Sequence, residues 1–242
     1  MALRTPLYPW HARAGARLIE FGGWEMPLQY SGIVDEHLTV RRSVGLFDVS
    51  HMGKLLVYGS KAQPFLDGLS ANDIPATPGR ARYTQLLRED GTIIDDVIVT
   101  CLTAARYFVV CNAGTRPMVL AWLAAHQPRD VRIDDLTMTH LCVAVQGPQS
   151  LTLLQRLTSV DLTAIRPFWG SVLDIRDSDP QSKKDYDEFV QMAARLESAS
   201  GIAALELNIS CPNVKKDGMC PALFAEPTFA LVKRLKSLSR RP

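Results

Sequence analysis

The hydrophobic pattern is interrupted by two adjacent acids within an otherwise apolar run over residues 93–100, which read Ile-Ile-Asp-Asp-Val-Ile-Val-Thr. β-Branched residues dominate this run and favour a strand because their branched Cβ packs well on a pleated surface. Strand side chains repeat every two residues, so Asp96 shares one face with Thr100. Asp95 shares the other face with Val97. One acid must therefore point towards the buried residues, where it needs hydrogen-bond donors or a ligand.

The acidic strand is predicted to belong to a β-hairpin. Residues 81–87 form its first strand, and Asp90-Gly91 centres the turn. Residues 107–112 predict a third strand. The local pattern also permits a simpler interpretation, in which the acids only support the turn at Glu89-Asp90-Gly91. Both interpretations remain open at this level.

The remaining pattern predicts short elements on both sides of this hairpin. Helices are expected over residues 33–44, 61–70, 115–123 and 147–157, and strands over 55–58 and 141–145. Residues 4–20 suggest a helix or helix-turn, and residues 21–30 an irregular turned segment because of Gly22-Gly23 and Pro27. Strands and helices interleaved with hairpins indicate an α+β fold with a mainly antiparallel sheet.

The character of the chain changes at about Trp169-Gly170. The pattern then predicts strand, helix, strand and helix over residues 171–175, 182–196, 203–210 and 227–238. That order is typical of a parallel βαβα unit. We therefore expect one domain over residues 1–169 and a second, shorter one over residues 170–242.

Composition limits the classes of function. Of 242 residues, 47% are hydrophobic and 21% charged, as in an ordinary globular protein, and the formal net charge is only +2. We therefore expect no nucleic-acid or membrane partner, and the absence of a leader pattern indicates the cytoplasm. The five cysteines include no C-x-x-C pair and are interpreted as free thiols, with no metal site. The sequence leaves the oligomeric state open.

Many short motifs occur in one order over the first part of the chain. They are Thr5-Pro6-Leu7-Tyr8, Phe21-Gly22-Gly23-Trp24-Glu25-Met26-Pro27, Glu36-His37, Val40-Arg41-Arg42, Gly45-Leu46-Phe47-Asp48-Val49-Ser50-His51-Met52-Gly53, Asp95-Asp96-Val97-Ile98-Val99, Asn112-Ala113-Gly114 and Gln146-Gly147-Pro148. Together they make residues 1–168 resemble the T-protein, the aminomethyltransferase of the glycine cleavage system. The resemblance implies a T-protein-like folate-binding domain.

The resemblance also implies a reaction and a site. Such a protein transfers a one-carbon unit from a lipoyl arm of the H-protein to tetrahydrofolate. Asp96 matches the family's catalytic acid, which can orient the attacking nitrogen and stabilise its growing positive charge. The positions that match folate-lining residues are Met52, Tyr83, Val110 and Asn112. The second half expected of a T-protein does not follow Gly170, so we expect an incomplete pocket and weak or absent activity.

The tail resembles a different family. The segment Glu206-Leu207-Asn208-Ile209-Ser210-Cys211-Pro212-Asn213 is similar to the active loop of FMN-dependent dihydroorotate dehydrogenases. The resemblance implies a partial (βα) barrel fragment, with Cys211 as a proton acceptor and Asn208 and Asn213 as pyrimidine ligands. Two alternatives to a folate enzyme therefore remain. One is an FMN oxidoreductase fragment, and the other is a chimeric reading frame without catalysis.

Overall fold

The structure of the protein is a computed structural model that describes residues 1–156, 158–171, 205–207 and 221–224. The chain divides into two compact units. The first contains Met1–Tyr30, Val49–His140 and Phe168–Gly170. The second contains Ser31–Asp48 and Leu141–Pro167, together with the described residues from Ser171 onward.

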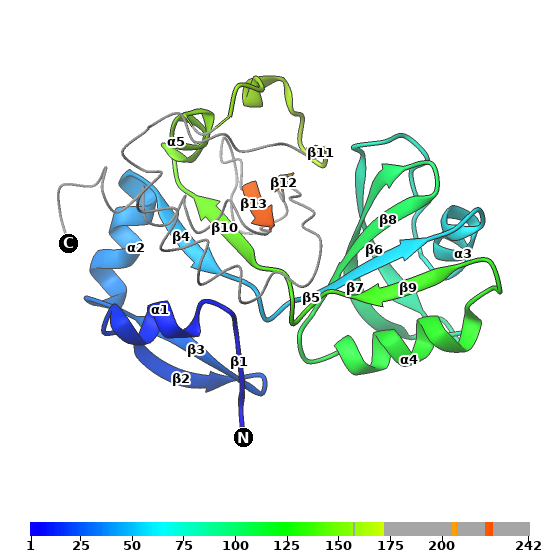
Figure 1. The fold of residues 1–242 in the computed structure, drawn as a ribbon, viewed down its shortest axis with the longest axis horizontal. Helices are drawn as coiled ribbons and strands as arrows, with labels where there is room; N and C mark the ends of the chain where they lie inside the picture. The colour runs from blue at the N-terminus through cyan, green and yellow to red at the C-terminus, as the bar shows by residue number, and fades with distance from the viewer. Residues whose placement is uncertain (157, 172–204, 208–220, 225–242) are drawn as a thin grey trace. The chain divides into compact units, whose positions relative to one another are not determined.

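The helices and strands follow one another along the chain as shown in Figure 1. They are β1 (Leu3–Arg4), α1 (Tyr8–Arg13), β2 (Arg17–Phe21), β3 (Trp24–Gln29), α2 (Ile33–Arg42), β4 (Gly45–Asp48), β5 (Gly53–Tyr58), α3 (Ala62–Gly68), β6 (Ala81–Leu87), β7 (Ile93–Thr103), β8 (Arg106–Cys111), α4 (Arg116–His126), β9 (Arg132–Asp135), β10 (Cys142–Gln146), α5 (Ser150–Gln155), the 3-10 helix η1 (Leu162–Ala164), β11 (Gly170–Ser171), β12 (Leu205–Leu207) and β13 (Pro221–Phe224). The helices and strands expected between residues 33 and 157 are present, with ends that differ by a few residues.

A five-stranded antiparallel sheet forms most of the first unit, in the order β6-β7-β8-β5-β9. Helices α3 and α4 pack on one face of this sheet, where the core contains Leu66, Val97, Val109 and Leu123. Figure 1 shows α4 running alongside the sheet. The predicted antiparallel sheet is confirmed, and its helix-covered face is where the hydrophobic stripe of β7 is buried.

The turn between β6 and β7 has the predicted chemistry. Gly91 has a φ of 81°, a left-handed conformation that glycine adopts without a steric penalty. Asp90 Oδ1 accepts hydrogen bonds from the Thr92 amide at 3.0 Å and the Thr92 hydroxyl at 2.7 Å. These bonds lower the pKa of the Asp90 carboxyl because they favour its ionised form. The turn is thus stabilised by Asp90 and leaves the later acids of β7 for other contacts.

The N-terminal prediction was wrong in part. Only α1 is helical within residues 4–20, and Arg17–Phe21 is strand β2, which pairs antiparallel with β3. The segment interpreted as irregular is a hairpin, since Phe21 pairs with Trp24 across the two-residue turn Gly22-Gly23. Both glycines have positive φ, as a type I′ hairpin turn requires. The glycine pair, interpreted from the sequence as part of an irregular turned segment, forms the turn of this hairpin.

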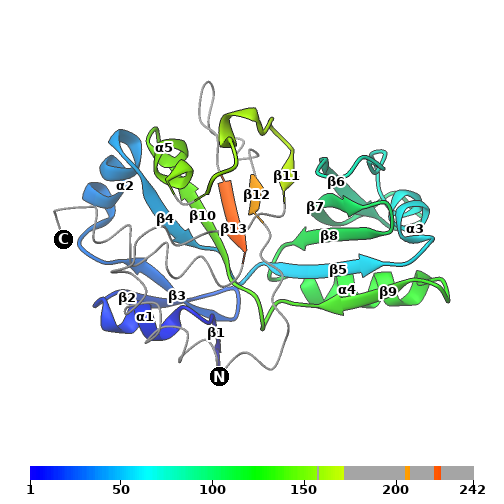
Figure 2. The same ribbon diagram turned by 45° about the horizontal axis from the view of Figure 1, so that its top comes forward.

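The second unit contains a sheet whose order is β11-β12-β13-β10-β4, visible in Figure 2. Strand β10 pairs antiparallel with β4 and with β13, and β12 pairs antiparallel with β13. Strand β12 lies inside the predicted strand 203–210, but β13 was not predicted. The parallel βαβα unit is therefore not confirmed, since both described tail strands lie in antiparallel pairs. The predicted tail helices lie outside the described residues.

Helix α2 begins beside a side chain that replaces a conventional cap. Glu36 Oε1 accepts from the backbone amides of Ser31 at 2.7 Å and Gly32 at 3.0 Å, both of which precede the helix. These amides would otherwise lack an intrahelical partner. Among the residues that the structure describes, no helix is long and apolar enough to cross a membrane.

Substitution of Gly59 tests the packing at the end of β5. Gly59 has a φ of 136°, and an added Cβ would lie 1.9 Å from the backbone oxygen of Asp130. We expect Gly59→Ala to lower the free energy of unfolding by about 2–4 kcal/mol in urea denaturation. Gly68→Ala is the control, because nothing lies within 4 Å of its Cβ position. Its expected change is within about 1 kcal/mol, and equal losses in both variants would contradict the prediction.

Candidate functional site

The two neighbouring acids of β7 point to opposite faces of the sheet. Asp95 lies opposite Leu86 and is only 5% exposed, on the face that α3 and α4 cover. Asp96 lies opposite Gln85 on the other face, and its side chain is exposed. The two-residue period of the strand thus separates a buried carboxylate from an accessible one, as the alternation predicts.

Asn112, directly after β8, hydrogen-bonds both acids. Its backbone amide donates to Asp95 Oδ2 at 2.9 Å, and its side-chain Nδ2 donates to Asp95 Oδ1 at 2.9 Å. The same Nδ2 lies 3.1 Å from Asp96 Oδ1 and 3.3 Å from the Asp96 backbone oxygen. The buried acid therefore has its donors within the chain. This answers one of the alternatives that the sequence left open, since Asp95 does not need a ligand to be satisfied.

Tyr83 completes the environment of Asp96. Its hydroxyl donates to Asp96 Oδ2 at 3.1 Å, and its side chain is 39% exposed. Tyr83 lies opposite Ile98, which lies opposite Val110, so the three side chains form one row across the sheet. The predicted residues Tyr83, Asp96 and Asn112 are thus brought together, and the buried Val110 lies in the same row as Tyr83.

Met52 lies in the turn just before β5, and a buried lysine holds that turn. Lys54 is fully buried, and its Nζ donates to the backbone oxygens of Ser50 at 2.7 Å and Met52 at 2.9 Å. Lys54 is opposite Val110 and so extends the row that contains Tyr83. Sequence reasoning missed this residue. The sequence does place this lysine directly before the apolar run Leu55-Leu56-Val57, so that it continues the predicted strand.

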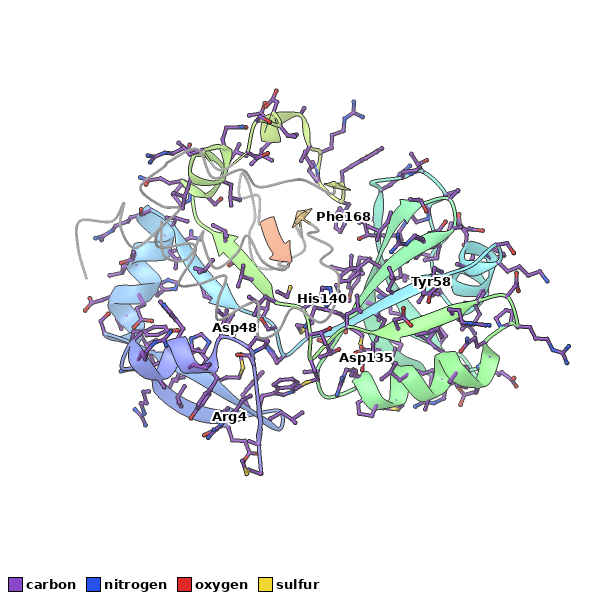
Figure 3. The ribbon with its side chains drawn as sticks, in the orientation of Figure 1. Arg4, Asp48, Tyr58, Asp135, His140 and Phe168 are labelled. Carbon is purple, nitrogen blue, oxygen red and sulfur yellow. The ribbon has the colours of Figure 1, made fainter. Side chains whose placement is uncertain are left out.

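The charge of Lys54 also affects a histidine of the same unit. Burial lowers the pKa of His140, and the nearby Lys54 ammonium lowers it further because the protonated imidazole is repelled. His140 is labelled in Figure 3. Its Nδ1 lies 2.8 Å from the Thr139 hydroxyl.

The helix-covered side of the sheet also carries a partly exposed ion pair. Arg116, in the first turn of α4, forms an ion pair of 2.7 Å with Asp135 of β9, which is labelled in Figure 3. Cys111 lies fully buried on the same face. Burial raises the pKa of its thiol to about 12, with smaller contributions from the negative charges of Asp95 and Asp135. Cys111 is therefore a neutral, unreactive thiol.

The other described cysteines agree with the free-thiol prediction, because Cys101, Cys111 and Cys142 are all buried and unpaired by disulfides. Cys211 and Cys220 lie outside the described residues, as do Asn208 and Asn213. Within the described part of the chain, no three His, Cys, Asp or Glu side chains gather as metal ligands would.

The arrangement around Asp96 has a definite chemistry. An exposed carboxylate is fixed at one oxygen by an amide and at the other by a phenol. Its remaining lone pairs accept hydrogen bonds or stabilise positive charge on a ligand. In the row beside it, Tyr83 is exposed while Ile98 and Val110 are buried. The site thus suits a ligand that presents N–H groups to Asp96.

Comparison with known proteins places the chain in a family. The family model described as the GCVT N-terminal domain matches residues 7–177. The chain therefore belongs to the GCVT N-terminal domain family. The T-protein resemblance of the first part is thereby confirmed at the level of the family.

Particular relatives are aminomethyltransferases. The chain is 44% identical over 169 residues to the aminomethyltransferase of Geobacillus thermodenitrificans, covering 69% of this chain and 46% of that protein. It is 43% identical over 169 residues to the aminomethyltransferase of Bacillus subtilis, covering 69% of this chain and 47% of that protein. The chain thus spans about half the length of the curated relatives it matches.

Two solved structures share the fold of this chain. The crystal structure of glycine cleavage system aminomethyltransferase T from Bartonella henselae has a TM-score of 0.76 and 26% identity, covering 99% of this chain and 58% of that chain. Heterotetrameric sarcosine oxidase from Corynebacterium sp. U-96 has a TM-score of 0.58 and 13% identity, covering 99% of this chain and 97% of that chain. The second similarity is one of fold alone.

Thiol alkylation tests the burial of Cys111. At about pH 8, a thiol with a pKa of about 12 is ionised in about 1 molecule in 10⁴, and the thiolate is the reactive form. We expect iodoacetamide to leave the Cys111 peptide unmodified in the native protein and to modify it fully in urea, as measured by peptide mass spectrometry. The unfolded protein serves as the control for intrinsic reactivity. Equal rates of modification in the two states would contradict the burial.

Proposed function

We propose that the chain carries a folate site of the aminomethyltransferase kind and takes part in tetrahydrofolate-dependent one-carbon transfer in glycine cleavage. One observation carries this proposal. In a chain of the GCVT N-terminal domain family, the exposed Asp96 carboxylate is held by Tyr83 and Asn112 beside an apolar row. Asp96 is the proposed catalytic acid. Met52, Tyr83, Val110 and Asn112 are the proposed folate-binding residues.

The residues around Asp96 fit a reduced folate by their chemistry. The reduced pterin ring carries N–H groups, and the carboxylate of Asp96 is a hydrogen-bond acceptor. When tetrahydrofolate is bound, it supplies the nitrogen nucleophile of the transfer. Asp96 would orient that nitrogen and stabilise positive charge on it, while Tyr83 and Asn112 keep the carboxylate in place.

The carbon donor and the cellular location are proposed from similarity to the relatives. The carbon unit would come from the lipoyl arm of an H-protein, as in the glycine cleavage system. The cytoplasm is the proposed location. Because the chain matches 46% of the length of its relative from Geobacillus thermodenitrificans, the activity of that whole protein is a proposal for this chain. Ligand binding, rather than turnover, is therefore the primary test.

Isothermal titration with tetrahydrofolate tests the site. We expect the wild-type protein to give saturable binding heat. Asp96→Asn removes the ionised acceptor but keeps the shape of the side chain. Loss of one hydrogen bond to a charged group corresponds to a weakening of the dissociation constant by about 10- to 100-fold.

Glu89→Gln is the matched control for this titration. Glu89 is an exposed carboxylate near the turn of the same hairpin, and no described side chain contacts it through a hydrogen bond. Its substitution changes the net charge equally, so its affinity should equal that of wild type. No binding by wild type, or equal binding by the Asp96→Asn variant, would remove the folate-site proposal.

The dihydroorotate dehydrogenase resemblance of residues 170–242 stays a prediction. Its proposed residues Asn208, Cys211 and Asn213 lie outside the described residues, and the family match ends at residue 177. An FMN fragment would release flavin from the purified protein on denaturation. We expect no flavin fluorescence in that supernatant, and a stoichiometric flavin signal would favour the oxidoreductase alternative.

A further inference from the structure

The buried Asp95 and the exposed Asp96 are connected by hydrogen bonds through Asn112. The two carboxylates point to opposite faces of β7, yet the side-chain amide of Asn112 lies within hydrogen-bonding distance of both. Asp95 also receives the Asn112 backbone amide. One residue at the end of β8 therefore connects the buried acid with the accessible one.

The orientation of the Asn112 amide follows from this geometry. Ionised carboxylates only accept hydrogen bonds, so the NH₂ group of Asn112 must face them and its Oδ1 must point elsewhere. A reversed amide would place its oxygen against carboxylate oxygens. Within the part of the chain that the structure describes, no group donates to Asn112 Oδ1. This oxygen is therefore available as an acceptor.

We propose that Asp95 is a positioning residue that acts through Asn112. Its buried carboxylate holds the backbone and the side-chain amide of Asn112, and the amide in turn fixes Asp96 Oδ1. Tyr83 fixes the other oxygen of Asp96. An exposed carboxylate without these contacts would rotate between several orientations.

This inference adds a positioning residue to the proposed folate site. What it says about the ligand rests on the proposed function. The ligand-facing polar atoms of the cluster are acceptors: the remaining lone pairs of Asp96, Oδ1 of Asn112 and the hydroxyl oxygen of Tyr83. The donors of Asn112 and Tyr83 are already used within the cluster. The site therefore selects a ligand edge that presents N–H donors, and Asp95 maintains this polarity.

A ligand-free measurement tests the first step. In wild type, the side-chain amide protons of Asn112 should exchange slowly with solvent in nuclear magnetic resonance spectra, because both are hydrogen-bonded. Asp95→Asn places an amide against donors, so exchange should accelerate by about 10-fold or more. The Glu89→Gln variant should exchange like wild type. Unchanged exchange in Asp95→Asn would overturn the proposal, whether or not folate binds.

Affinity for tetrahydrofolate tests the second step through a double-mutant cycle. We expect Asp95→Asn and Asn112→Ala each to weaken the dissociation constant by about 10- to 100-fold. Because Asp95 acts through the Asn112 side chain, adding Asp95→Asn to Asn112→Ala should weaken binding by less than about 3-fold more. Multiplicative effects, or wild-type affinity in Asp95→Asn, would overturn the positioning role.

A stability control separates positioning from general loss of structure. Gly59→Ala perturbs the opposite end of β5 from Gly53, which pairs with Cys111 next to the site. It should be destabilised yet keep the wild-type dissociation constant at a temperature where all variants are folded. Equal weakening in Gly59→Ala would assign the effect of Asp95 to stability alone. If Asp95→Asn does not fold, the wild-type exchange rate of the Asn112 side-chain amide decides, since exchange as fast as that of an exposed asparagine would overturn the proposal. If wild type does not bind folate, the proposed function fails, and the exchange measurement alone decides whether Asp95 holds the amide.

Discussion

A buried carboxylate needs donors, and this requirement connects the core of the first unit with its accessible face. Asp95 lies among apolar side chains, where an unpaired charge is strongly unfavourable. The chain meets the requirement with Asn112, which arrives at the end of the neighbouring strand. Because Asn112 also contacts Asp96, the energetic demand of the core determines the orientation of a group outside it.

Sequence patterning anticipated the parts of this arrangement that depend on local chemistry. The period of β7 assigned Asp95 and Asp96 to opposite faces, and Asp90-Gly91 predicted the turn. Patterning did not anticipate that one side chain would serve both acids, because Asn112 reaches them through strand pairing. It also missed the burial of Lys54, since lysines are usually exposed, whereas here the backbone oxygens of Ser50 and Met52 accept hydrogen bonds from the buried ammonium.

The errors at the two ends of the chain have different physical origins. The glycines at positions 22 and 23 were interpreted as breakers, although paired positive φ angles are what a tight hairpin requires. In the tail, β13 pairs with β10, a strand far away in the sequence, and no local pattern specifies such a partner. Membership of the GCVT N-terminal domain family supplies the context for the first part. Membership of a family does not by itself determine function, because related folds perform different chemistry.

Strands β6, β7 and β8 follow one another directly, so Tyr83, Asp95, Asp96 and Asn112 all belong to a single up-down-up ribbon. Contacts between residues close in sequence form with little loss of chain entropy and favour rapid folding. The acidic cluster is thus assembled by the most local part of the sheet. The hydrogen bonds of the cluster thus all form within one continuous ribbon, while α3 and α4, which flank this ribbon in the chain, bury the face that carries Asp95.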